Sequence, residues 1–395
     1  MASYLSKLYS WLLAGAILLA PLNLFLRWLE SQAYLNGIFS DYLIAKIWLA
    51  EIPIFLIIII WLFNVIKKKS IIFLKNKLFI FLLLVIFIRQ FFTNNDLLAI
   101  ISFFRFLELG LLLLFLKNNF DQLNKSLIYS AFVLSFLGQI ILANSQFFLQ
   151  SNLFDYHFFG ETSLTNSLNI AKVNFKTGQV INPYGSTAHP NILAGFLVIN
   201  AIILLKKLEL NKKTSIYLGW LLIIMTSWTL FLTQAYSAIA SFIIFLILQT
   251  FKQLQKQLSL NWLLLSSIII PIILSWFNQL DQLSITRRVS LNQQAIKIWL
   301  DHFFWGTGLN NFLYYLKPNT TEVIRFIQPV HHSLLLWLTE VGLVGASLVV
   351  CLKDELKKRN VLTTLFIILP LIALDHYLLT QWLGGWLLIL AITLL

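Results

Sequence analysis

The chain has little charge and almost no cysteine. Charged residues make up 11% of its 395 residues and hydrophobic residues 59%, whereas a soluble domain carries about 25% charged residues. A soluble protein of this composition would have almost no surface to show to water, so lipid is the expected solvent. The single cysteine, Cys351, excludes a disulfide framework within the chain and any cysteine-based metal cluster.

The apolar residues form long continuous runs, which favour membrane helices over the alternating strands of a barrel. With roughly 20 residues needed for each crossing, we count about twelve spans. The sequence therefore predicts an all-α polytopic membrane protein in which residues 1–395 form a single integral domain. No small-residue cleavage site follows the first span, so we expect it to be an anchor. The approximate cores of the spans are 9–26, 42–65, 78–92, 97–116, 126–149, 190–205, 215–232, 236–251, 260–276, 333–350, 361–378 and 382–395.

Lysine and arginine residues gather in alternate connections between these spans, for example at 67–77, 206–213 and 353–359. Positive charge marks the cytoplasmic side of a membrane protein, so we expect these connections and both termini to be cytoplasmic. The formal charge of +13 is then a topology signal. A nucleic-acid partner is not expected, because no soluble region carries a basic patch interleaved with aromatic residues.

Two long loops, 150–189 and 277–332, fall on the opposite, extracytoplasmic side. Within the second loop, the apolar pattern of 288–299 predicts a helix at the membrane surface, which Gly306 and Gly308 break. Histidine exchanges protons near neutral pH, so we expect any proton chemistry on this side, unless the segregation of the histidines arose by chance. The six histidines all belong to this outer half: His157, His189, His302, His331, His332 and His376.

His331 and His332 stand where the second loop becomes an apolar span. The N-terminus of a helix disfavours imidazolium, so a neutral histidine acting as a general base is one interpretation. A histidine that only caps the helix together with Ser333 is the other. The sequence by itself does not separate these interpretations, and His332 could share or replace the role of His331.

Three further groups of polar residues each have a functional and a structural interpretation. Arg287 and Arg288 match the geometry of phosphate oxygens and suggest a pyrophosphate clamp, or they snorkel at the interface. The 189–191 segment, His-Pro-Asn, opens a helix near the first loop. Arg105 and Glu108 lie one turn apart inside a span and can pair locally, and Glu51 is a further buried charge.

The chain offers no HExxH or DxD motif, and the two adjacent histidines would point in different directions on a helix. The segment from Gly306 lacks the Lys-Ser/Thr of a nucleotide loop. We therefore expect neither a metal nor a cofactor.

These motifs resemble those of the superfamily of O-antigen ligases and O-antigen polymerases, which are polytopic membrane glycosyltransferases. The resemblance extends from about Tyr184 onward and includes HPNILAGFL from His189 and the triplet 375–377. In this register His331 takes the place of the functional histidine and His332 that of an asparagine. The matching positions are Arg288, Gly306, Gly308, Asn311, Phe312, His331, His332, Leu335, Glu340, Gly342 and Gly345.

The chain departs from the family pattern in two places. Asn182 stands where the family often has an arginine, and Tyr236–Ser237 stand near the place of a Ser-Arg pair. Lys172, Lys176 and Arg325 are candidates to replace the missing positive charge.

The resemblance implies a fold of the GT-C type in a bacterial inner or plasma membrane, with the active site outside the cytoplasm. It implies an inverting, metal-independent transfer from an undecaprenyl-pyrophosphate-linked glycan donor to a glycan, lipid or protein acceptor. Arg288 would hold the leaving pyrophosphate, and His331 would position or deprotonate the acceptor hydroxyl. The residues expected to contact the substrates are Arg287, His189, Asn191, Arg325, His332 and Asn311.

A flippase for lipid-linked sugars, or another transporter, is the alternative. Transporters place polar groups at the bilayer midplane on broken helices and often contain repeats. In this chain the polar groups gather in two outer loops and no repeat is evident, which favours the enzyme.

Overall fold

The structure of this protein is a computed structural model that describes residues 2–28, 30–67, 77–154, 156–164, 170–175, 178–208, 213–250, 282–316, 327–351, 356 and 358–395. The expected span 260–276, Lys176 and Arg325 lie outside these residues.

Helices dominate the fold, as the long apolar runs predict. They are α1 (Ala2–Leu19), α2 (Glu51–Lys67), α3 (Lys77–Arg89), α4 (Asp96–Asn119), α5 (Lys125–Leu149), α6 (Tyr156–Phe159), α7 (Pro190–Lys207), α8 (Lys213–Thr233), α9 (Tyr236–Thr250), α11 (Gln282–Asp301), α13 (Ser333–Ala346), α14 (Leu348–Cys351), α16 (Arg359–Leu374), α17 (Tyr377–Thr380) and α18 (Trp382–Leu394). Short 3₁₀ turns join several of them, among them η2 (Asp41–Leu43) and η7 (Phe312–Tyr315).

Three short antiparallel strand pairs correct the all-α expectation. They are β1 (Phe25–Trp28) with β4 (Ala45–Trp48), β2 (Tyr34–Leu35) with β3 (Ile38–Phe39), and β5 (Lys172–Phe175) with β6 (Gly178–Ile181). The first pair falls where the sequence predicted the end of one span and the start of the next. Aromatic and branched residues at 25–28 and 45–48 favour strands, so α1 ends at Leu19 and α2 begins only at Glu51.

Four helices among the described residues are long and apolar enough to cross a membrane: Asp96–Gln122, Lys125–Leu149, Pro190–Lys207 and Thr214–Thr233. Shorter apolar helices occupy the places of other expected spans, including Tyr4–Leu19, Tyr236–Thr250 and Trp382–Leu394. The structure thus supports a helical membrane protein, and the count of twelve spans stays a prediction.

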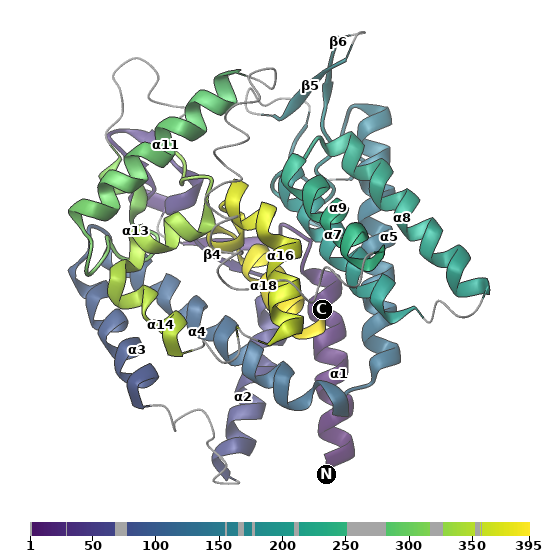
Figure 1. The fold of residues 1–395 in the computed structure, drawn as a ribbon, viewed down its shortest axis with the longest axis horizontal. Helices are drawn as coiled ribbons and strands as arrows, with labels where there is room; N and C mark the ends of the chain where they lie inside the picture. The colour runs from purple at the N-terminus through teal and green to yellow at the C-terminus, as the bar shows by residue number, and fades with distance from the viewer. Residues whose placement is uncertain are drawn as a thin grey trace.

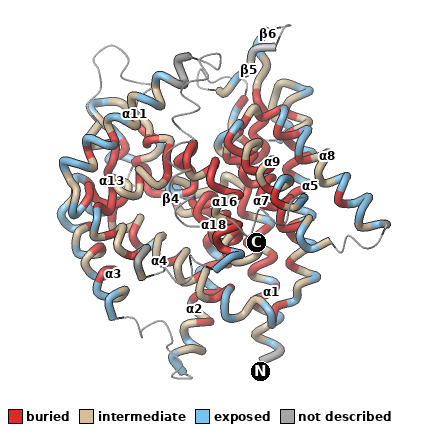
Figure 2. The backbone as a smooth tube through the Cα atoms, viewed as in Figure 1, coloured by how far each residue is buried: buried red, intermediate tan, exposed pale blue. Residues whose placement is uncertain are grey.

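Helix α7 forms the centre of the bundle. Of its apolar window 78% is buried, against 28% for α4, and Figure 2 shows buried residues along α7 and α18 while α3 and α8 expose one side. Large apolar side chains face outward on the periphery; Phe63 and Tyr217, for example, are 68% and 73% exposed. Such a surface suits lipid and not water.

Helix α11 and the β5–β6 hairpin lie at one end of the molecule, and the first residues of α1 lie at the opposite end (Figure 1). Helix α11 confirms the helix predicted at 288–299 and is longer at both ends. It stops at Asp301, before the glycines that were expected to break it.

The expected span 333–350 is broken, because Gly342 has non-helical angles (φ 61°, ψ −165°) inside α13. The turn after α11 inserts at this break. Thr307 N donates to Thr339 O at 2.9 Å, and Leu343 N donates to Phe303 O at 2.8 Å. These bonds use backbone groups that the broken helix leaves without a helical partner, and they fix α11 against α13.

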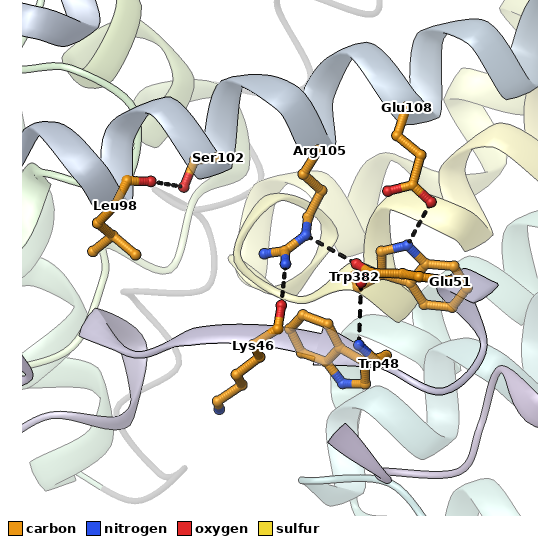
Figure 3. A network of polar contacts seen from close by, with 8 residues as sticks. All are labelled: Lys46, Trp48, Glu51, Leu98, Ser102, Arg105, Glu108 and Trp382. Carbon is orange, nitrogen blue, oxygen red and sulfur yellow. Dashed lines mark hydrogen bonds and ion pairs between the residues drawn. The ribbon is translucent and has the colours of Figure 1, made fainter. Parts of the chain in front are cut away.

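The buried charges pair differently from the sequence-based prediction. Arg105 does not pair with Glu108; its Nε lies 3.2 Å from Glu51 Oε1, and it also donates to the carbonyl oxygen of Lys46 (Figure 3). Glu108 instead accepts a hydrogen bond from Trp382 Nε1 at 3.4 Å. Lys46 on β4 and Glu51 at the start of α2 together give the guanidinium two acceptors, which a single carboxylate on the same helix does not.

Candidate active site

The two adjacent histidines have different tasks. His332 is the N-cap of α13, where its Nδ1 accepts a hydrogen bond from Leu335 N at 3.2 Å. His331 therefore does not cap the helix. Its ring packs on that of His376 with the centroids 4.8 Å apart, and its Nδ1 is buried without a hydrogen-bond partner. The predicted capping role thus falls to His332, and the imidazole of His331 is not used to cap the helix.

His376 follows Asp375 in the short link between α16 and α17. The Asp375 carboxylate accepts a hydrogen bond from Asn191 Nδ2 at 2.9 Å and another from the Ser237 hydroxyl. The Asp375 carbonyl accepts from Ser333 Oγ at 2.7 Å. This link therefore joins the starts of α7, α9 and α13, and it brings His376 to His331.

His189 opens α7 and also lies at this cluster. Its Nδ1 accepts a hydrogen bond from Asn191 N at 3.1 Å, so it is the N-cap of the helix whose first residue is Pro190. Its side chain stays accessible to solvent. The surrounding protein and the charge of Arg288 nevertheless lower the pKa of His189.

Arg288 on α11 is the cation common to the cluster. Burial lowers the pKa of His331 well below its usual value, with His376 and Arg288 as the next causes. Burial, with the charges of His189 and Arg288 as smaller causes, lowers the pKa of His376 to about 3. The three imidazoles are therefore neutral at physiological pH, and the positive charge of the site belongs to arginine.

Burial acts in the other direction on the carboxyl group of Asp375 and raises its pKa. Arg288 and the hydrogen bonds from Ser237 and Asn191 oppose this effect, because they stabilise the charged form.

The cluster has an accessible layer and a buried layer. His189 is exposed, and Arg288, His331 and Asn191 are partly exposed. Beneath them, His376 is 8% and Asp375 3% exposed. The cation and two of the imidazoles are therefore accessible from outside the protein, whereas His376 and Asp375 are not.

The other residues expected to contact substrates are arranged as follows. Arg287 precedes Arg288 on α11, and its charge adds to the lowering of the His331 pKa. Asn311 is fully buried at the start of α4, where its Oδ1 accepts from Asn95 N at 2.9 Å and its Nδ2 donates to Leu309 O at 3.0 Å. The structure does not bring Asn311 into the histidine cluster.

Asn182, at the place of the missing family arginine, donates from Nδ2 to Thr233 O at 2.8 Å, while its Oδ1 is buried without a hydrogen-bond partner. Lys172 lies on β5 and is exposed.

Three residues of the cluster were not assigned from the sequence. In the sequence, Asp375 and His376 belong to the triplet 375–377, and His376 is also one of the six histidines of the outer half, but neither is assigned a role there. The adjacent carboxylate and imidazole are the available signal. Tyr42 carried no signal: it lies in η2, and its hydroxyl is 3.5 Å from His376 Nε2.

Among the residues that the structure describes, no three His, Cys, Asp or Glu side chains are arranged to hold a metal ion. The helices and the cluster define a helical membrane protein with a histidine–arginine site.

Residues 187–350 match the family model described as O-antigen ligase, which supports the resemblance of the chain to the O-antigen ligase superfamily. The matched segment contains His189, Arg288 and His331, and it does not reach Tyr42 or His376. A search of curated proteins finds no match for the chain. The family supports a glycosyltransferase-like function in polysaccharide assembly.

Proposed function

We propose that this protein is an inverting, metal-independent glycosyltransferase that moves a glycan from an undecaprenyl-pyrophosphate carrier onto an acceptor hydroxyl. The observation that carries the proposal is the cluster itself: the His331 ring packs on His376, and His331 Nδ1 has no hydrogen-bond partner. Burial, and after it neighbouring charges that include Arg288, lowers the pKa of His189, His331 and His376. A fixed cation beside neutral bases suits a reaction that expels an anionic leaving group and removes a proton.

Arg288 holds the pyrophosphate in this mechanism. Its guanidinium presents a planar fork that matches two phosphate oxygens, and Arg287 adds positive charge from the same helix. As the bond between the anomeric carbon and the pyrophosphate breaks, negative charge accumulates on the leaving oxygen. Arginine stabilises this charge more strongly than the charge of the ground state, which lowers the barrier.

His331 accepts the proton of the acceptor hydroxyl. The hydroxyl oxygen forms its bond to the anomeric carbon from the side opposite the pyrophosphate, so the configuration inverts. Binding of the donor brings negative charge beside Arg288 and raises the pKa of His331. The histidine thus becomes a stronger base once the donor is in place. His189 and Asn191, at the accessible start of α7, contact the substrates beside it.

The protein functions in a bacterial plasma membrane with the cluster on the extracytoplasmic side and both termini in the cytoplasm. Carriers of this kind present the glycan at the membrane surface, where α11 lies in the proposed topology. The acceptor is a glycan, a lipid or a protein.

Reconstituted protein tests the proposal. Liposomes that contain the purified full-length chain receive an undecaprenyl-pyrophosphate-linked oligosaccharide and each acceptor class, and the products are separated by mass. We expect one acceptor to gain the glycan with release of undecaprenyl pyrophosphate, and transfer by His331→Ala to be slower by roughly 10²–10⁴-fold. Movement of a fluorescent donor between leaflets without any transfer would instead establish a flippase.

A further inference from the structure

The pairing of Tyr42 with His376 lies outside the segment that matches the family. The two residues are 334 positions apart in sequence, yet their rings meet edge to face with centroids 5.3 Å apart. The His376 ring also packs against His331. His376 thus contacts both a tyrosine and the proposed base, and it is almost fully buried.

The neighbours of His376 select one of its two neutral tautomers. Thr380 Oγ1 donates to the His376 carbonyl oxygen, so its lone pair is free to accept the proton of His376 Nδ1 at 2.8 Å. The ring then carries its proton on Nδ1 and presents Nε2 as an acceptor. The Tyr42 hydroxyl faces that nitrogen and supplies the donor. Burial, followed by the charges of Asp41 and Asp375, raises the pKa of Tyr42 to about 12, so its donor proton is retained.

We propose that Tyr42 and His376 are positioning residues for glycosyl transfer: Tyr42 fixes His376 as a neutral ring, and this ring orients His331. The inference rests on the proposed role of His331 as the base. Because His376 is buried beneath the accessible residues, it acts through His331 and not by contact with the substrate.

The chain from Tyr42 to Trp48 is fixed by hydrogen bonds at Tyr42 itself and at Lys46 and Trp48. Asn310 Nδ2 donates to the Tyr42 carbonyl oxygen at 3.2 Å from the glycine turn. Downstream, Arg105 binds the Lys46 carbonyl, and Glu51 accepts from Trp48 N at 3.1 Å (Figure 3). The buried ion pair of Arg105 and Glu51 therefore anchors residues 46–48, which follow Tyr42 in the chain.

The groups that act on the protonation of His376 come from each element around it. His189 and Arg288 oppose a positive charge on the ring, His331 packs against it, and Asp375 is the neighbouring carboxyl group. Tyr42 donates to Nε2 and Thr380 accepts from Nδ1. Loss of the Tyr42 donor removes a bond that only the neutral ring makes, so it raises the pKa of His376.

Tyr42→Phe is the sharpest variant, because it removes one hydroxyl and keeps the ring contact. With reconstituted full-length protein, we expect kcat to fall about tenfold, the order of one lost hydrogen bond, with the donor KM unchanged. In the pH profile of kcat, the acid limb should move to higher pH. Tyr34→Phe is the matched control, since Tyr34 is exposed on β2 in the same region, and it should behave as wild type.

Two outcomes would overturn the inference. A folded Tyr42→Phe protein with the kcat and pH profile of wild type would show that the hydroxyl does not support His331. A rise in donor KM at unchanged kcat would show that Tyr42 binds the substrate directly.

A second measurement does not depend on transfer. The chain has six histidines, so nitrogen NMR of histidine-labelled protein, with His376→Gln to assign one signal, reports the tautomer of His376. We expect a proton on Nδ1 and a titration that moves to higher pH in Tyr42→Phe. An Nε2–H tautomer would contradict the inference, whereas failure of wild type to transfer any glycan would contradict only the proposed function.

Discussion

Gly306 and Gly342 approach each other so closely that neither position has room for a side chain. A Cβ atom on Gly342 would lie 2.5 Å from Gly306 N and 2.4 Å from the Phe304 carbonyl oxygen. Both glycines have positive φ, 66° and 61°, a region that costs other residues energy. This contact joins the end of α11, which carries Arg288, to the break in α13, which follows His331. It therefore sets the distance between the proposed clamp and the proposed base.

We expect Gly342→Ala to lower both the thermal stability of the protein in detergent and its rate of glycan transfer. The added methyl group meets backbone atoms, which cannot rotate away, and the positive φ adds strain of about 1–2 kcal/mol. Gly138→Ala on α5 is the control, because a Cβ there has no neighbour within 4 Å. Equal melting temperatures for the two variants would contradict the packing argument.

His331 and His332 should respond differently to substitution. Loss of a general base lowers kcat by roughly 10²–10⁴-fold, so we expect this loss for His331→Ala. His332→Asn should keep most of the activity, because asparagine is a good N-cap. Circular dichroism and transfer rates for both variants provide the comparison. An inactive, folded His332→Asn protein beside an active His331→Ala protein would reverse the assignment.

Arg288→Lys keeps the charge and removes the planar fork. We expect a fall in kcat/KM of about 10–100-fold, because an ammonium group cannot bind two phosphate oxygens in the same geometry. Arg27→Lys, on the exposed strand β1, is the control. Steady-state transfer rates at varied donor concentration would decide, and wild-type kinetics in Arg288→Lys would argue against a bidentate clamp.

The pH dependence follows from the lowered pKa of His331. Transfer needs the neutral ring, so activity persists as the pH falls through the usual histidine pKa of about 6.5 and is lost only below the lowered value. The profile of kcat/KM, which reports the free enzyme, should therefore have its acid limb well below that pH. The limb of kcat, which reports the donor complex, should lie at higher pH because bound pyrophosphate raises the pKa. Coincident limbs near pH 6.5 would contradict both effects.

The proposed orientation can be tested by labelling. After replacement of the native Cys351 by serine, Gln179→Cys on the exposed hairpin strand β6 should react with an impermeant maleimide on intact cells. Gln122→Cys, exposed beyond the end of α4, should react only after permeabilisation. The opposite pattern would invert the map derived from the lysines.

The residue pattern predicted the mostly helical character of the fold but not its three strand pairs or the break at Gly342. Continuous apolar runs identify helices because lipid demands them, and the polar residues between those runs identified His189, Arg288 and His331. The missing partners are residues brought in by tertiary packing. Tyr42 lies in a segment read as the start of a span, and nothing in its local sequence indicates that it meets His376. Arg105 pairs with Glu51 and not with the predicted Glu108 for the same reason, because the spacing of residues along one helix does not show which residues of another helix lie beside it.

The cluster is assembled from segments that begin near residues 42, 189, 237, 288, 331 and 375. Asp375 and His376 leave the ribosome after the other segments, so a nascent chain that ends before them carries the proposed clamp and base without their support. Membrane insertion of most of the protein would thus precede any reaction with lipid-linked sugar.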